Sequence, residues 1–171
     1  MLETVRSESR PGAPLIRAGE VRVWHGDLNY AVRDGTNFYR LLSEDERLRA
    51  AQFNEARQRA RFIAGRGILR EILGRCLNMA GRELRFCYGP RGKPLLLNDD
   101  GGSPCYFNLA HSGERLVLAV TRIGEIGVDI EQPRAGLEVD TIARYICTPR
   151  ERAALRSLSA AQRQDSLLRC W

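Results

Sequence analysis

The sequence predicts an α+β fold, because two kinds of hydrophobic periodicity occupy different parts of the chain. Apolar residues recur at helical spacing between residues 43 and 77, and they alternate with a period of two between residues 84 and 131. The 171 residues are 43% hydrophobic and 28% charged, which is the composition of a compact globular protein and excludes disorder throughout.

The first ordered element is predicted to be a strand after Gly19. Residues 1–19 have low hydrophobicity and contain Arg10-Pro11-Gly12, so we expect a flexible leader there. Residues 21–27 then alternate and are rich in β-formers such as Val23. The sequence therefore places the first strand at residues 21–27.

A long helical region follows, from Ser43 to Leu77, with an interruption near Asn54. Ser43 and Glu46 have the spacing of a capping box, which marks the start of a helix. The predicted buried stripe consists of Phe62, Gly65, Ile68, Leu69, Ile72, Leu73 and Cys76. A glycine within this stripe, Gly65, predicts a close approach of another element.

Three arginines form a basic shoulder beside this stripe. They are Arg59, Arg66 and Arg70, with Arg61 at the edge. A charged helix face is usually solvated, and a surface that binds phosphates is the alternative.

Mostly antiparallel strands are predicted after the helical region. They cover residues 84–88, 105–109, 116–121 and 125–131. A glycine- and proline-containing turn at residues 89–94 follows the first of them. Thr148 and Glu151 then form a second capping box, with Pro149 at the first helical position, so a helix is expected from there through Leu158.

The formal net charge of +6 points to a phosphate-bearing or polyanionic partner. Residues 1–94 hold 18 basic and 11 acidic residues, so the positive potential lies early in the chain. No stripe of stacking aromatic residues accompanies the arginines, so we do not expect nucleic acid as the partner. Lys93 is the only lysine beside 26 arginines, which hints at a position that needs a compact ammonium group.

The cysteines and the hydropathy pattern exclude several other classes of protein. Five cysteines without a C-x-x-C pair argue against a disulfide framework and a zinc site, so we expect small core residues. They are Cys76, Cys87, Cys105, Cys147 and Cys170. No run approaches the ~20 uncharged apolar residues of a membrane span, and no secretory signal is visible, so we expect a cytoplasmic protein.

The strongest local motif is the run of residues 126–131. Period two places Asp129 and Glu131 on one face of the predicted strand, about 6–7 Å apart. Two such carboxylates suit a hard cation such as Mg²⁺, which is typically completed by substrate phosphate oxygens. A strand with a solvated outer face is the alternative.

His111 and Lys93 are candidates for binding a phosphate group. His111 is expected where a strand runs into a polar loop, and an imidazole can donate a hydrogen bond to a phosphate oxygen. Ser112 is unsuited to a relay with His111, because adjacent strand residues point to opposite faces. A structural loop residue for His111, and a solvated turn residue for Lys93, are the alternatives.

Taken together, these segments resemble the 4′-phosphopantetheinyl transferases, and specifically the larger, surfactin-type class. The matching segments follow the family's order. They are residues 21–24, 42–47, 61–62, 92–94, 108–112, 127–131 and 148–151, followed by Trp171. The resemblance implies transfer of the phosphopantetheine arm of coenzyme A to a serine of an apo acyl or peptidyl carrier protein. It also implies release of adenosine 3′,5′-bisphosphate and a requirement for Mg²⁺.

The resemblance also implies roles for individual residues. Asp129 and Glu131 match the family's metal ligands at the catalytic centre. The residues that match contacts to coenzyme A are Arg61, Lys93 and His111 at its phosphates, Arg49 as a weaker match, and Ser112 beside the same nucleotide. Glu151 matches a catalytic acidic position that opens the next helix, where capping alone is the alternative.

Members of the larger class fold as two similar halves with the active site between them. The resemblance therefore implies a first half over residues 20–131 and the start of a second half over residues 132–171. Ala110 departs from the family pattern, which usually has serine before the histidine. Trp171 falls where the family's W-x-x-K-E segment begins, so we expect a chain truncated within its second half. A coenzyme A-binding module without transferase activity is the alternative, and the oligomeric state and the carrier pathway are left open.

Overall fold

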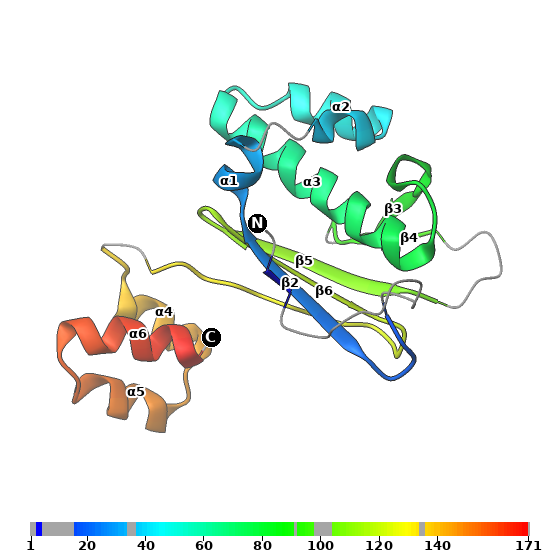
Figure 1. The fold of residues 1–171 in the computed structure, drawn as a ribbon. Coiled ribbons are helices and arrows are strands. Elements are labelled where there is room, and N and C mark those ends of the chain that lie inside the picture. Colours follow the sequence, from blue (N-terminus) through cyan, green and yellow to red (C-terminus); the bar gives the residue numbers. More distant parts are fainter. Residues whose placement is uncertain are drawn as a thin grey trace. The chain divides into compact units, whose positions relative to one another are not determined.

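The computed structural model describes residues 3–4, 16–33, 37–90, 92–97, 104–133 and 136–170 (Figure 1). Its elements form an α+β fold with antiparallel strand pairing, as predicted. The chain divides into two compact units, Met1–Ile130 and Glu131–Trp171. The boundary lies one residue before the predicted end of the first half, at residue 131.

The first unit contains a four-stranded sheet in the order β1-β2-β6-β5. The strands are β1 (Glu3–Thr4), β2 (Val21–Asp27), β5 (Tyr106–Ser112) and β6 (Arg115–Thr121). The register pairs Trp24 with Leu118 and Leu109 with Leu118, so β6 lies between β2 and β5. Strand β5 is therefore an edge of this sheet, which exposes one row of its backbone to other segments.

Helices cover one face of this sheet (Figure 1). They are α1 (Leu28–Arg33), the 3₁₀ turn η1 (Phe38–Leu41), α2 (Glu44–Ala51) and α3 (Ala56–Leu77). The predicted interruption near Asn54 is confirmed, because α2 ends at Ala51 and α3 begins at Ala56. The stripe of α3, including Leu69 and Leu73, packs with Trp24 and Leu118 of the sheet in one core.

Between α3 and β5 the chain forms a small hairpin. The 3₁₀ turn η2 (Gly81–Glu83) precedes β3 (Phe86–Tyr88), which pairs with β4 (Pro94–Leu96). Of the predicted strand over residues 84–88, the last three residues form β3. Arg91, at the predicted turn, lies outside the described residues.

The close approach predicted at Gly65 occurs instead at Gly67. A Cβ atom on Gly65 would lie 3.7 Å from Leu116, an ordinary contact, whereas on Gly67 it would lie 2.3 Å from the Cβ of buried Phe38. We expect Gly67→Ala to lower the free energy of unfolding by about 1–3 kcal/mol through overpacking. Gly65→Ala is the matched control, expected to be neutral or to stabilise by up to about 1 kcal/mol through helix propensity. Equal stabilities of the two variants in urea denaturation would contradict this account.

The basic shoulder of α3 is solvated only in part, because Arg59 is exposed whereas Arg66 and Arg70 are buried. Arg70 is 1% exposed and Arg66 is 8% exposed. Arg70 Nε donates to Glu46 Oε2 at 2.6 Å, and its Nη1 donates to the carbonyl oxygens of Gly81 and Leu84. Glu46 also accepts from the Ser43 backbone N–H, which completes the predicted capping box of α2. One carboxylate thus caps α2 and anchors α3.

The prediction of a strand over residues 125–131 is wrong. The segment shows the expected alternation, with Ile126, Val128 and Ile130 half-buried, but it makes no backbone ladder and is not a strand. Side chains hold it instead. The backbone N–H of Val128 donates to the side-chain oxygen Asn108 Oδ1 at 2.7 Å. In a strand, this N–H would instead donate to a backbone carbonyl oxygen of the neighbouring strand.

The second unit is a group of three helices. They are α4 (Val139–Ile146), α5 (Pro149–Arg156) and α6 (Ala160–Cys170). The predicted capping box at Thr148 and Glu151 is confirmed, with Pro149 in the first turn, and α5 ends two residues before the predicted Leu158. Ala143, Cys147, Leu155 and Leu167 form its buried core.

The predicted leader is only partly described, and three of its described residues contact the first unit. Glu3 pairs with His25 and Thr4 with Trp24, and Ile16 is buried in the core of the first unit. Residues 1–2 and 5–15 lie outside the description. Among the helices that are described, none combines the length and the apolar character that crossing a membrane requires.

All five cysteines are free thiols. Cys76, Cys105 and Cys147 are buried, as predicted for core residues, whereas Cys87 is half-buried and Cys170 is exposed at the end of α6. Burial raises the pKa of the Cys76 thiol to about 12, and burial also raises the pKa of Cys105 and Cys147. These three thiols therefore stay protonated at neutral pH and are poor nucleophiles.

Candidate functional site

His111 and Ser112 lie on opposite faces of strand β5. Both residues belong to the strand, so the predicted polar loop begins only at Gly113. His111 is exposed and Ser112 is 4% exposed, which agrees with the prediction that adjacent residues point to opposite faces. The structure leaves the imidazole of His111 accessible and does not bring the Ser112 hydroxyl to the same face.

Arg61 lies against the hairpin that carries His111. Its Nη2 donates to Glu114 Oε1 at 3.1 Å, and its Nε donates to Asn29 Oδ1 at 3.1 Å. Arg57 donates to the same Glu114 oxygen at 2.7 Å. Glu114 also accepts from the Leu28 backbone N–H through its carbonyl oxygen, at 2.8 Å. This clamp joins α3, the start of α1 and the β5–β6 turn, and it holds two guanidinium groups at one end of the sheet.

Lys93 connects the β3–β4 turn to the segment that carries Asp129. Its Nζ donates to the carbonyl oxygen of Ile126 at 2.7 Å. The bond between Val128 and Asn108 fixes the same segment to β5. An ammonium group has three donors, so a lysine held by one carbonyl keeps two for a ligand.

Arg49 is exposed on α2 and lies near α3. Its guanidinium carbon is 5.6 Å from the ring centroid of Phe62, and that of Arg66 is 5.7 Å from the same ring. These are cation–π distances, which orient the side chain without neutralising its charge. Arg49 thus adds positive charge beside α3, and no described contact joins it to His111 or Lys93.

Asp129 and Glu131 are both exposed, at the end of the first unit and the start of the second. Asp129 Oδ1 accepts from the Ile130 backbone N–H at 2.9 Å. Within the described parts of the chain, no group of three or more histidine, cysteine, aspartate or glutamate side chains could hold a metal ion. The donor set is therefore one or two exposed carboxylates, which fits Mg²⁺ completed by phosphate oxygens and water and does not fit an all-protein cage.

Glu151 belongs to the cap of α5. Its Oε2 accepts from the Thr148 backbone N–H at 2.7 Å and from the Thr148 hydroxyl at 2.8 Å. These hydrogen bonds, the backbone one first, hold the pKa of the Glu151 carboxyl below its ordinary value of 4.5. The described contacts of Glu151 are therefore those of a helix-capping residue, which was the alternative to a catalytic role in the sequence analysis.

The lowered pKa of Glu151 predicts a pH-dependent stability of the second unit. A carboxyl whose pKa is lower in the folded state stabilises fully above its unfolded value of 4.5, and this contribution is lost as the pH falls through the folded value. We expect Glu151→Gln to be less stable than the parent chain at pH 7, and this difference to shrink as the pH falls below 4.5. Thermal melts followed by circular dichroism test this, and a stability difference that persists at low pH would contradict it.

The structure adds residues that the sequence did not single out. Asn108 and Glu114 hold the segments that carry Asp129 and Arg61. The sequence signal for Asn108 is its position in residues 108–112, one of the segments that resemble the family. Nothing in the spacing of Glu114 marks it, because its partners lie 53 and 57 residues earlier in the chain.

Two family models match this chain in succession. The description of the first is "4'-phosphopantetheinyl transferase, N-terminal", and it covers residues 32–123, more than half of the chain. The second, "4'-phosphopantetheinyl transferase superfamily", covers residues 125–171. The chain belongs to the 4′-phosphopantetheinyl transferase family.

Curated relatives carry the same family name. The chain is 36% identical over 162 residues to the 4′-phosphopantetheinyl transferase HetI of Nostoc sp., and the match covers 95% of the chain and 68% of HetI. It is 34% identical to a putative 4′-phosphopantetheinyl transferase of Synechocystis sp., over 77% of the chain and 53% of that protein. It is 31% identical to AcpT of Salmonella typhimurium, over 71% of the chain and 58% of AcpT. The chain thus spans between about half and two thirds of the length of these relatives.

Solved structures of holo-[acyl-carrier-protein] synthases are more distant. That of Helicobacter pylori, in complex with coenzyme A, aligns over 60% of this chain with a TM-score of 0.45 and 13% identity. That of Neisseria meningitidis aligns over 58% with a TM-score of 0.46 and 16% identity. The family assignment rests on the sequence matches.

Proposed function

We propose that the protein transfers the 4′-phosphopantetheine arm of coenzyme A to a serine hydroxyl of an apo acyl or peptidyl carrier protein. The serine oxygen attacks the pyrophosphate phosphorus that carries the pantetheine arm and loses its proton. The bond to the bridging oxygen breaks, and adenosine 3′,5′-bisphosphate leaves. The observation that carries the proposal is the pair of successive family matches, which together run from residue 32 to residue 171.

The cationic groups of the first unit suit a ligand with several phosphate groups. We propose that Arg61, Lys93 and His111 contact the phosphates of coenzyme A and that Arg49 adds a weaker contact. Lys93 is held by the Ile126 carbonyl oxygen and Arg61 by Glu114 and Asn29, so both charges are ordered before a ligand arrives. Such pre-ordering lowers the entropic cost of binding.

Ser112 and Glu151 have weaker support. Ser112 is buried on the face opposite His111, so we propose it as a residue that supports the hairpin beside the nucleotide rather than as a direct ligand. For Glu151 we propose the catalytic role that its match to the family's acidic position implies, while its described contacts to Thr148 support the helix cap.

Asp129 and Glu131 would hold Mg²⁺. When bound, the ion would neutralise charge on the pyrophosphate and on the leaving group. The chain itself supplies the support: Lys93 at Ile126 and Asn108 at Val128 fix the backbone just before Asp129. We propose that these two bonds orient the Asp129 carboxylate toward the phosphates that Lys93 contacts.

We further place the protein in the larger, two-half class, with residues 20–131 as the first half and residues 132–171 in the second. Two observations support this placement. One family model is described as N-terminal and ends at residue 123, and the superfamily model begins at residue 125. The division into two compact units after Ile130 agrees with it.

The experiment that tests the proposed function is the intact mass of apo carrier proteins after incubation with coenzyme A, MgCl₂ and the protein. A panel of fatty-acid, polyketide and peptide-synthetase carriers covers the candidate substrates. We expect a mass increase of one phosphopantetheine on at least one carrier, and none when coenzyme A or Mg²⁺ is omitted. No increase on any carrier would overturn the proposal, whereas coenzyme A binding without transfer would favour a binding module.

A further inference from the structure

Two cysteines of the second unit, Cys147 and Cys170, lie side by side, and the proposed transfer reaction uses neither. Cys147 directly follows α4 and is 6% exposed, whereas Cys170 is the last residue of α6 and is exposed. The two thiols lie within hydrogen-bonding reach of each other. In such an arrangement a dissolved oxidant can reach one member of a pair whose other member is buried beside it.

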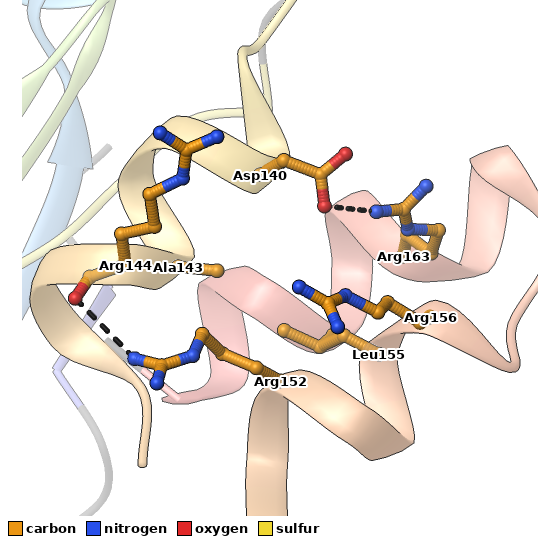
Figure 2. A pocket seen from close by; sticks show the side chains of 7 residues that line it. All are labelled: Asp140, Ala143, Arg144, Arg152, Leu155, Arg156 and Arg163. Carbon is orange, nitrogen blue, oxygen red and sulfur yellow. Dashed lines mark hydrogen bonds and ion pairs between the residues drawn. The ribbon is translucent and has the colours of Figure 1, made fainter. Parts of the chain in front are cut away.

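The packing of α4 against α6 explains why these two thiols meet. Arg163 of α6 forms an ion pair with Asp140 of α4, which sets the register of the two helices (Figure 2). Cys147 stands seven residues after Asp140, and Cys170 stands seven residues after Arg163. Two contacts at the same spacing on both segments show that α4 and α6 run in the same direction. Seven residues are about two helical turns and return to the same helix face, so both cysteines lie at the seam between the helices.

Hydrogen bonds on both sides fix the backbone of Cys147. Its N–H donates to the Ala143 carbonyl oxygen at 3.1 Å, and its carbonyl oxygen accepts from Arg152 Nη1 at 3.0 Å. Figure 2 shows the same guanidinium group against the carbonyl oxygen of Arg144. The buried thiol therefore has a fixed position, and rotation about the Cα–Cβ bond of Cys170 adjusts the distance between the two sulfur atoms.

We propose that Cys147 and Cys170 are a redox-sensitive pair that a low-molecular-weight disulfide oxidises to a disulfide bond. In the first step, the exposed Cys170 loses its proton, its sulfur attacks one sulfur of glutathione disulfide, and one glutathione thiolate leaves. Cys147 then loses its proton, its sulfur attacks Cys170 Sγ, and the second glutathione thiolate leaves. Two protein thiols are oxidised, one disulfide is reduced, and the two protons end on the two released glutathione molecules.

Burial decides the order of these steps. Burial raises the pKa of the Cys147 thiol, with the neighbouring Cys170 thiol as a further cause, so Cys147 is a poor nucleophile toward a dissolved oxidant. Its attack on Cys170 is intramolecular, and the closeness of the two sulfur atoms compensates for the small thiolate fraction. Cys76 and Cys105 also share one core, but they are only 5% and 4% exposed, so a dissolved oxidant reaches neither thiol.

The disulfide would clamp the end of α6 to the end of α4. It closes the loop from Cys147 to Cys170, which contains α5, and such a cross-link restricts the unfolded chain. We expect the thermal midpoint of the oxidised protein to lie about 5 °C or more above that of the reduced protein. Melts followed by circular dichroism, with and without dithiothreitol, measure the difference. An unchanged or lower midpoint after oxidation would overturn the clamp.

The direct test incubates the reduced protein with glutathione disulfide and follows its intact mass under non-reducing conditions. We expect a transient glutathione adduct at Cys170, followed by a species two hydrogen atoms lighter than the reduced protein, and dithiothreitol is expected to restore the starting mass. Peptide mapping is expected to join the peptide of Cys147 to that of Cys170. No reaction of Cys170, a stable adduct on it, or a disulfide between other cysteines or between two molecules would overturn the proposal.

Single substitutions separate the two thiols. Cys147→Ser is expected to stop at the glutathione adduct on Cys170, and Cys170→Ser is expected to form no disulfide. Cys87→Ser is the matched control, because Cys87 is half-buried in the first unit, and it is expected to form the disulfide within about twofold of the parental rate. If Cys147→Ser loses its helical circular dichroism, Cys147→Ala replaces it, with the same adduct expected. Disulfide formation that survives Cys170→Ser, or an equal loss in Cys87→Ser, would overturn the proposal.

Discussion

Asp129→Ala is expected to lower the rate of phosphopantetheine transfer by about 10²-fold or more, because it removes a carboxylate proposed to hold Mg²⁺ at the reacting pyrophosphate. Asp129 is exposed, and its described hydrogen bond is to the neighbouring Ile130 backbone, so the fold is expected to survive. The rate of mass gain on an apo carrier protein measures the effect. The thermal unfolding midpoint, recorded beside it, separates lost activity from lost structure.

The matched control for this variant is Glu125→Ala. Glu125 is an exposed acidic residue of the same segment and lies on the same side of the alternating pattern. It is expected to keep its transfer rate within about twofold, since no metal role is proposed for it. Near-parental turnover by Asp129→Ala would contradict the metal assignment, and so would an equal loss in both variants.

Glu46→Gln is expected to lower the free energy of unfolding of the first unit by about 3–5 kcal/mol. Glu46 and Arg70 are each 1% exposed, and their ion pair is 2.6 Å long. Removing one charge leaves the other buried without its partner, which costs more than the pair contributes. The glutamine keeps an amide oxygen for the Ser43 backbone N–H, so the loss reports on the ion pair more than on the helix cap. Urea denaturation followed by tryptophan fluorescence measures it.

Two comparisons make this prediction specific. Glu44→Gln alters an exposed acid in the first turn of the same helix and is expected to cost no more than about 0.5 kcal/mol. The double variant Glu46→Gln with Arg70→Met is expected to recover part of the stability that Glu46→Gln loses, since the more deeply buried Arg70 charge is removed with its partner, whereas Arg66, 3.9 Å from Glu46, keeps its charge. A loss in Glu46→Gln no larger than in Glu44→Gln would show that the buried pair is not essential.

Local patterns in the sequence located the elements that local interactions determine. The two capping boxes, at Ser43 and Thr148, and the strand at residues 21–27 could be predicted because their signals lie within a few consecutive residues. The burial of Arg70 could not, because its partner Glu46 is 24 residues earlier and charged residues on a helix are usually solvated. The segment at residues 125–131 alternates as a strand does, yet the Asn108 side chain takes the place of a strand partner, and periodicity does not reveal what a backbone N–H binds.

In the candidate site, too, local patterns identified some residues, whereas others depend on contacts between distant segments. Motifs identified His111, Lys93 and Asp129 as chemically suitable residues, and the opposite faces of His111 and Ser112 followed from strand geometry. The clamp around Glu114 depends on contacts between segments more than 50 residues apart, so it required the structure. The helices α4 and α6 were not predicted, because the signals used for residues 132–171 came from the single capping box at Thr148.

The hydrogen bond of Lys93 has a practical consequence for covalent labelling. Because Lys93 is the only lysine, an amine-reactive reagent can modify one ε-amino group in the whole sequence, apart from the terminal amine. That amino group is held at the Ile126 carbonyl oxygen, so its rate of acylation reports how often the β3–β4 turn separates from the residues before Asp129. The parent sequence thus carries a built-in single-site probe for this contact, without the need to introduce a label by mutation.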